Sequence, residues 1–147
     1  MKFPPISTFT TKGFLGIFAL LLFISFDSSA KKVRFLYSAV APATQGYVKI
    51  SQDKYNYYII KIRLSNLKEA YRLKPPKLYY VVWVFDDKGY TMDLGRMDSS
   101  IRLLTKKLKA SFKYSTEFKP VRIFITAEDD LSQQYPGTQE VLTTDII

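Results

Sequence analysis

The sequence predicts one small all-β sandwich domain of about seven to eight short antiparallel strands. Its composition is typical of strands: 47% of the residues are hydrophobic, with 11 Tyr and 11 Phe, and bulky side chains favour a pleated surface. Several segments alternate between apolar and polar residues, and turn signals recur roughly every 8–12 residues. The length of 147 residues fits a single domain.

The clearest strand lies at residues 55–67. Ile60 and Ile62 alternate there with Lys61 and Arg63, so we expect the isoleucines to face the core and the cations to face solvent. A helix would scatter these charges around its cylinder. The period of two therefore predicts a half-buried strand.

The segment 78–85 is apolar on both faces, which indicates a central strand buried on both sides. Residues 86–89 have the composition of a hairpin turn, and Gly95 is a candidate β-bulge in the returning strand. Residues 99–106 are ambiguous, with a short helical turn as one interpretation. Further strands are expected at 33–41, 47–51, 91–97, 108–114, 121–128 and 141–146.

The N-terminus has the order of a secretory signal peptide. Lys2 and Lys12 precede an unbroken apolar run at 14–26, and the small residues Ser28 and Ala30 follow. Thirteen helical residues extend over about 20 Å, which is short for a hydrocarbon core of about 30 Å. We therefore expect residues 1–30 to be a signal peptide that is cleaved after Ala30.

Cleavage would leave residues 31–147 as one β-sandwich domain in the periplasm or outside the cell. It would lower the formal net charge of +9 by one, because two lysines and one aspartate lie in the leader. An alternative is an uncleaved segment that anchors the protein in the inner membrane with the domain outside.

The chain has no Cys and no His. This excludes disulfides, Cys/His zinc or haem sites, Ser-His-Asp and Cys-His catalysis, and a His general base. We expect no cofactor, no catalytic residue and no enzymatic activity.

Four stretches in one order carry a family resemblance: PATQGYVKI at 42–50, SNLKEAYRLKPPKLYYVVWV at 65–84, MDLGRM at 92–97, and FKPVRIFITAEDDLSQQYPGTQEVLTTD at 118–145. They resemble the extracytoplasmic C-terminal domain of bacterial anti-sigma-K factors. They also resemble small exported bacterial proteins that consist of that domain alone. The matching positions are Gly46, Trp83, Gly89, Gly95, Thr126, Glu128, Pro136 and Gly137.

The resemblance implies an immunoglobulin-like β-sandwich on the outer side of the membrane. It does not carry over anti-sigma activity, which belongs to a cytoplasmic N-terminal domain that the residues before position 14 do not provide. We therefore expect an exported, non-enzymatic binding or structural module. A membrane-anchored accessory in sigma/anti-sigma regulation is an alternative. A carboxylate-dependent envelope enzyme using Asp86 and Asp129 is a second alternative.

A basic stripe is the candidate surface for an anionic partner, such as an envelope polymer or lipid headgroups. The stripe equally fits an edge that lysines protect from aggregation. Export argues against nucleic acid as a partner, and we expect contact with the membrane only through an uncleaved leader. An unidentified protein remains the other candidate partner. The stripe comprises Lys107, Lys109, Lys113, Lys119 and Arg122.

Two further groups have both a functional and a structural interpretation. Glu128, Asp129 and Asp130 are weak calcium candidates, because calcium prefers clustered carboxylate oxygens, but they also fit a solvated turn. Among the aromatic residues, Trp83 fits a core position better than a ligand groove. The tyrosines at 55, 57 and 58 fit either a stacking surface or cross-strand packing.

Overall fold

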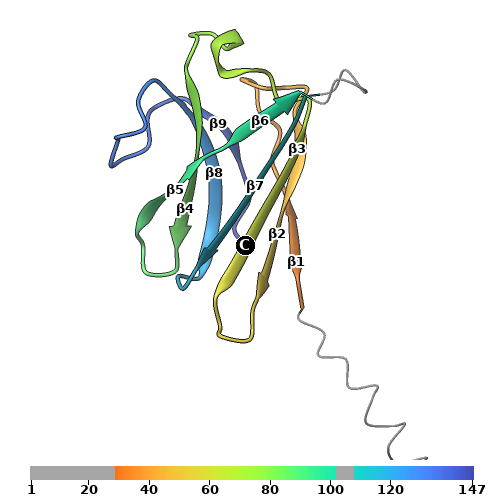
Figure 1. The fold of residues 1–147 in the computed structure, drawn as a ribbon, viewed down its shortest axis with the longest axis vertical. Coiled ribbons are helices and arrows are strands. Elements are labelled where there is room, and N and C mark those ends of the chain that lie inside the picture. Colours follow the sequence, from red (N-terminus) through yellow and green to blue (C-terminus); the bar gives the residue numbers. More distant parts are fainter. Residues whose placement is uncertain (1–28, 102–107) are drawn as a thin grey trace, which may run out of the picture.

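The computed structural model describes residues 29–101 and 108–147, which form two antiparallel β-sheets packed as a sandwich (Figure 1). The first sheet has the order β1 (Lys31–Arg34), β2 (Gln45–Gln52), β3 (Tyr58–Ser65), β7 (Leu108–Thr116), β6 (Asp98–Ile101). The second has the order β5 (Thr91–Arg96), β4 (Tyr79–Asp86), β8 (Pro120–Glu128), β9 (Glu140–Thr143). The predicted all-β class is confirmed, with nine strands in the described ranges instead of seven to eight.

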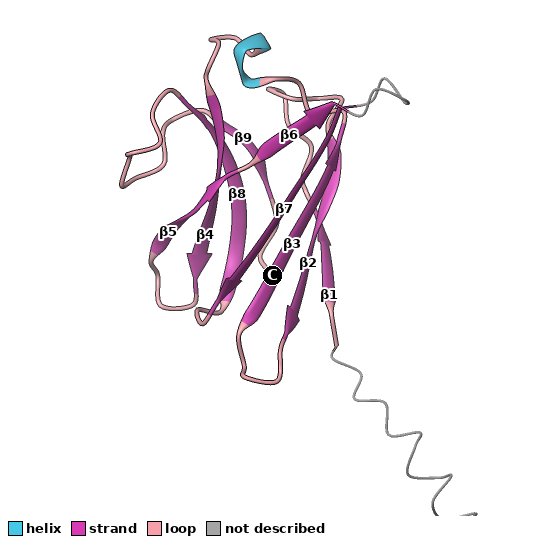
Figure 2. Cartoon of the chain, viewed as in Figure 1, coloured by secondary structure: helices cyan, strands magenta, loops and turns pink. Residues whose placement is uncertain are grey.

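Helix is almost absent from this part of the chain. The described ranges contain one short 3₁₀ turn, η1 (Ala70–Arg72), in the connection between β3 and β4 (Figure 2). No helix within them is long and apolar enough to cross a bilayer. The predicted signal segment up to residue 28 lies outside the described residues.

The inner faces of the two sheets share one apolar core. Val48, Ile60, Val82, Ile123 and Ile125 are each 0% exposed and come from four different strands. Burial of such a side chain contributes about 1.5–3 kcal/mol. The alternation predicted for residues 55–67 is confirmed, because Ile60 and Ile62 are buried while Lys61 and Arg63 are exposed.

The central strand β4 is buried on both faces, as its continuous apolar run predicts. Val82 and Val84 face the shared core, whereas Val81 and Trp83 form a second buried cluster with Phe124 of β8. Successive side chains of a strand point to opposite faces. Trp83 is therefore buried, as its predicted core position requires, and it lies in the second cluster on the outward face of its sheet.

The β4–β5 turn forms as predicted. Gly89 has a φ of 89°, and its N–H donates to the carbonyl of Asp86. The Oδ1 atom of Asp86 accepts the N–H groups of Lys88 at 2.9 Å and Tyr90 at 2.8 Å. The predicted bulge is also present, because the β4–β5 register shifts opposite Gly95.

The chain changes sheets between β5 and β6. Met97 is buried, and its N–H donates to the carbonyl of Tyr80 at 2.9 Å. Residues 98–101 then pair with β7, so the interpretation of the ambiguous segment as a helical turn is wrong for residues 99–101. The rest of that predicted turn, 102–106, lies outside the described residues.

The first strand is shorter than predicted and ends at Arg34. Phe35 instead forms an isolated bridge with Thr144, and the N–H of Leu36 donates to the carbonyl of Thr143 at 2.8 Å. These contacts join the β1 edge of one sheet to the β9 end of the other. The N–H of Phe35 still donates to the carbonyl of Gly46 in β2 at 3.2 Å, so this residue contacts both sheets.

Candidate anion-binding site

The outward face of the five-stranded sheet is strongly basic. Residues paired in register share one side of a sheet, so the pairing of β1, β2, β3 and β7 identifies the side chains that point away from the core. β1 contributes two cations to this side, β2 one, β3 two and β7 two, and all of them are exposed. We call this set the basic face: Lys32, Arg34, Lys49, Lys61, Arg63, Lys109 and Lys113.

Four lysines of the basic face form one row across four strands. Lys49 lies opposite Lys32 on one side and opposite Lys61 on the other. Lys61 in turn lies opposite Lys113. Neighbouring strands are about 4.8 Å apart, so the row extends over about 14 Å. The sheet thus presents a linear array of ammonium groups at close spacing.

This array has few opposing charges. None of the seven cations forms an ion pair with another residue of the described ranges, whose ion pairs involve Glu69, Asp129 and Glu140. The outward positions of β1, β2, β3 and β7 that the register identifies include no acidic residue. Like charges directly opposite each other are destabilising, by about 0.6 kcal/mol for two ammonium groups about 7 Å apart in water. The row therefore lowers stability, and a bound anion would relieve this repulsion.

Replacing Lys61 with glutamine is expected to stabilise the protein by about 1 kcal/mol at low ionic strength, because it removes the repulsions with Lys49 and Lys113. Denaturant titration followed by circular dichroism at about 10 mM and about 500 mM NaCl measures the gain, which high salt should largely abolish. The exposed Lys54 is the matched control, and Lys54→Gln should change the free energy by less than about 0.5 kcal/mol. A less stable Lys61→Gln protein would contradict the repulsion.

A groove of about 670 Å³ opens on the basic face. None of its described lining residues is acidic, and its cations are Lys32, Arg34, Arg63 and Lys109. Arg34 and Arg63 lie on either side of Tyr47 in register, and the Lys32 ammonium lies 3.9 Å from the centre of the Tyr47 ring. Guanidinium groups bind phosphate and carboxylate through paired hydrogen bonds. The groove therefore offers the chemistry of an anion site.

The stripe predicted from the sequence is divided by the fold. Lys109 and Lys113 belong to the basic face, and Lys119 lies in the turn between β7 and β8. Arg122 lies on β8 in the other sheet, 3.5 Å from the Glu140 carboxylate and with its guanidinium 4.7 Å from the Phe124 ring centre. Lys107 lies outside the described residues. The stripe divides because the chain passes from one sheet to the other between β7 and β8.

Five residues of the basic face were missing from the predicted stripe: Lys32, Arg34, Lys49, Lys61 and Arg63. Alternation alone predicted that Lys61 and Arg63 face solvent. It carries no information about which strands are neighbours, and the row exists only because β1, β2, β3 and β7 lie side by side.

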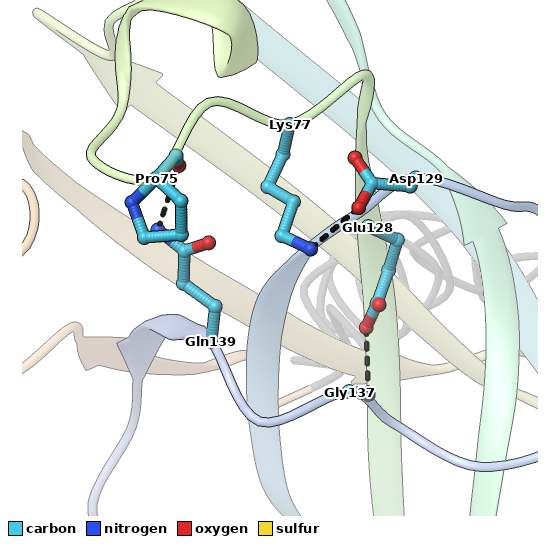
Figure 3. Close-up of polar contacts among 6 residues, drawn as sticks. All are labelled: Pro75, Lys77, Glu128, Asp129, Gly137 and Gln139. Atoms are coloured by element: carbon cyan, nitrogen blue, oxygen red, sulfur yellow. Dashed lines mark hydrogen bonds and ion pairs between the residues drawn. The ribbon is translucent and has the colours of Figure 1, made fainter.

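The three calcium candidates bind different partners, and Figure 3 shows the contacts of Glu128 and Asp129. Glu128 is 3% exposed and accepts the N–H of Gly137 at 2.7 Å. Asp129 lies 2.6 Å from the Lys77 ammonium. The Asp130 carboxylate accepts hydrogen bonds from both the backbone N–H and the hydroxyl of Ser132. These hydrogen bonds, the backbone one first, lower the pKa of the Asp130 carboxyl. The three carboxylates thus fix the β8–β9 loop through separate contacts, and the described residues contain no group that could hold a metal ion.

Asp86 and Asp129, the residues named for the enzyme alternative, lie at opposite ends of the second sheet. Tyr79 at the start of β4 pairs with Glu128, whereas Asp86 at its end pairs with Pro120. Seven residues of strand separate these ends by about 23 Å. Asp129 follows Glu128 directly, so its carboxylate is far from that of Asp86. Paired carboxylates that cleave a glycosidic bond lie roughly 5–10 Å apart, so these two cannot act as such a pair.

The aromatic candidates are dispersed. Trp83 is 1% exposed, so it offers no ring to a ligand, and its Nε1 donates to Thr126 Oγ1 at 2.8 Å. Tyr58 is half-buried against the core, while Tyr55 and Tyr57 are exposed at the turn between β2 and β3. Of the aromatic candidates, only Tyr55 and Tyr57 therefore have exposed rings that could form a stacking surface.

The chain was compared with models of protein families, with curated proteins and with solved structures, and none of these comparisons found a match.

Proposed function

We propose that the chain is an exported, non-enzymatic β-sandwich module of the bacterial envelope that binds an anionic partner through the basic face. The row of Lys32, Lys49, Lys61 and Lys113 is the observation that carries the proposal. A sheet that served only as scaffold would gain stability from alternating charges across its strands. Here four like charges are aligned at a cost in stability, which supports a role in binding.

Export is proposed from the leader-like order of residues 1–30 and from the resemblance to the outer-side domain of anti-sigma-K factors. The strand order supports the immunoglobulin-like part of that resemblance. If β2 is taken as strand A, the two sheets have the orders A-B-E-D, with β1 as an additional strand beside A, and C′-C-F-G. Trp83 departs from the pattern of antibody domains, because it lies on the outward face of its strand. An N-terminus at Lys31 in protein recovered from cells would support cleavage after Ala30.

Calorimetric titration of the full chain with inorganic polyphosphate tests the proposed binding surface. We expect saturable binding that weakens as salt rises, because polyanion binding by lysines releases counterions. The double variant Lys49→Glu/Lys61→Glu should bind at least about tenfold more weakly, since it places two acids within the row.

The control double variant, Lys54→Glu/Lys88→Glu, makes the same change in net charge at two exposed positions in turns outside the basic face. Its affinity should stay within about twofold of the unmodified chain. Equal losses in both double variants would mean that net charge, and not the basic face, drives binding.

A further inference from the structure

An exposed apolar segment follows β1, and we call residues 36–40 the apolar loop. Leu36, Tyr37 and Val40 expose 49%, 82% and 38% of their surfaces. The start of the loop is held in place, because the N–H of Leu36 donates to the carbonyl of Thr143 at 2.8 Å. These side chains are therefore presented to solvent by a segment that is tied to the sandwich.

The apolar loop and the basic face meet in one groove. Leu36 and Tyr37 line it together with Arg34, Arg63 and Lys109. The three cations come from three different strands of the same sheet, and the loop continues directly from β1. A partner that fills this groove contacts apolar, aromatic and cationic side chains at the same time.

We propose that the basic face and the apolar loop together dock the protein on the surface of an anionic phospholipid bilayer. This inference rests on the proposed function, and it identifies the anionic partner as lipid. Cations that project from one side of a sheet can reach many phosphate groups of a bilayer surface at once. Their apolar stems tolerate the interface while the charged ends stay hydrated.

The apolar loop favours a bilayer over a soluble polyanion. A soluble polyanion needs only the cations and gains nothing from Leu36 or Val40, whereas apolar side chains enter the boundary between headgroups and acyl chains. Tyrosine is enriched at that depth because its ring is apolar and its hydroxyl is polar. The inference also differs from the expectation that only an uncleaved leader would contact the membrane.

Sedimentation of the full chain with lipid vesicles tests the inference. One set of vesicles mixes phosphatidylglycerol with phosphatidylcholine, and the other contains phosphatidylcholine alone. The apolar run at residues 14–26 would bind both sets alike, so the ratio of the two affinities is the quantity measured. We expect at least about tenfold preference for the anionic vesicles, and its loss in Lys49→Glu/Lys61→Glu.

Changes in the apolar loop separate lipid from soluble polyanion. Leu36→Ser/Tyr37→Ser should weaken binding to anionic vesicles by about tenfold and polyphosphate binding by less than about twofold, because the two residues line the groove but carry no charge. The matched control is Leu131→Ser/Tyr135→Ser, which replaces the same residue types in the β8–β9 loop, where they expose 42% and 77%, and should leave both affinities unchanged.

Full vesicle binding by the apolar-loop variant, or equal affinity for neutral and anionic vesicles, would overturn membrane docking. Polyphosphate binding that depends on Lys49 and Lys61 without any vesicle binding would overturn docking and leave the proposed function standing. Failure to bind either probe would overturn both.

Discussion

Replacing Trp83 with alanine is expected to lower the free energy of unfolding by about 4 kcal/mol. Trp83 is 1% exposed, and its ring is stacked on Phe124 with centroids 6.5 Å apart and planes inclined by 15°. Its Nε1 also donates to Thr126 Oγ1 in a buried hydrogen bond. Alanine would leave a large cavity in the second cluster and a hydroxyl without its donor, and domains of this size have only about 5–15 kcal/mol in total.

Urea unfolding followed by far-ultraviolet circular dichroism measures this loss. Trp83→Phe is the graded control, because it keeps a ring beside Phe124 and loses the indole hydrogen bond, so about half of the loss is expected. Polyphosphate affinity of the folded Trp83→Ala protein should be unchanged, since the basic face lies on the other sheet. A loss below about 1 kcal/mol for Trp83→Ala would mean that the second cluster is loosely packed.

Replacing Gly46 with alanine is expected to cost about 3 kcal/mol, because β2 and β3 approach too closely there for a side chain. Gly46 pairs with Leu64, on the side of the sheet that faces the core. A methyl group at Gly46 would overlap the carbonyl oxygen of Arg63 and would lie 3.1 Å from the Cα atom of Leu64. Backbone atoms cannot rotate away as a side chain does, so the β2–β3 ladder must shift.

Gly89→Ala is the control for this prediction. Gly89 has open space around it but a φ of +89°, so alanine there costs only the strain of a left-handed backbone, about 1–2 kcal/mol. Thermal unfolding of both variants should rank Gly46→Ala as the less stable. Equal or reversed ranking would show that β2 and β3 can separate at Gly46 at little cost. Because Arg63 lines the groove, we also expect Gly46→Ala to weaken polyphosphate binding.

Where one face of a strand is buried, the local pattern of apolar and polar residues was sufficient to predict the strand and its buried side. Ile60 and Lys61 alternate in sequence, and the structure places them on opposite faces of β3. Residues 98–101 have no such alternation, and β6 forms there because β7 offers it an edge for pairing. To predict β6, the order of the strands in the sheet would have to be known, and that order depends on contacts between distant parts of the chain.

The candidate site was predictable only in part for the same reason. Lys113 and Arg122 are close in sequence and were grouped together, but they lie in different sheets. Lys49 and Lys113 are far apart in sequence, yet both flank Lys61. Charge along one strand can be read from the sequence, whereas charge across strands depends on topology.

The uneven distribution of charge gives the molecule an electrical polarity perpendicular to its sheets. Seven cations project from the five-stranded sheet, while the strands of the four-stranded one carry the acids Asp86, Asp93, Glu128 and Glu140 and only two cations, Arg96 and Arg122. Such a dipole experiences a torque near a negatively charged wall before any contact is made. Arriving molecules would consequently rotate in solution and settle in one common orientation, with the four-stranded sheet and the β8–β9 loop left accessible to the surrounding medium.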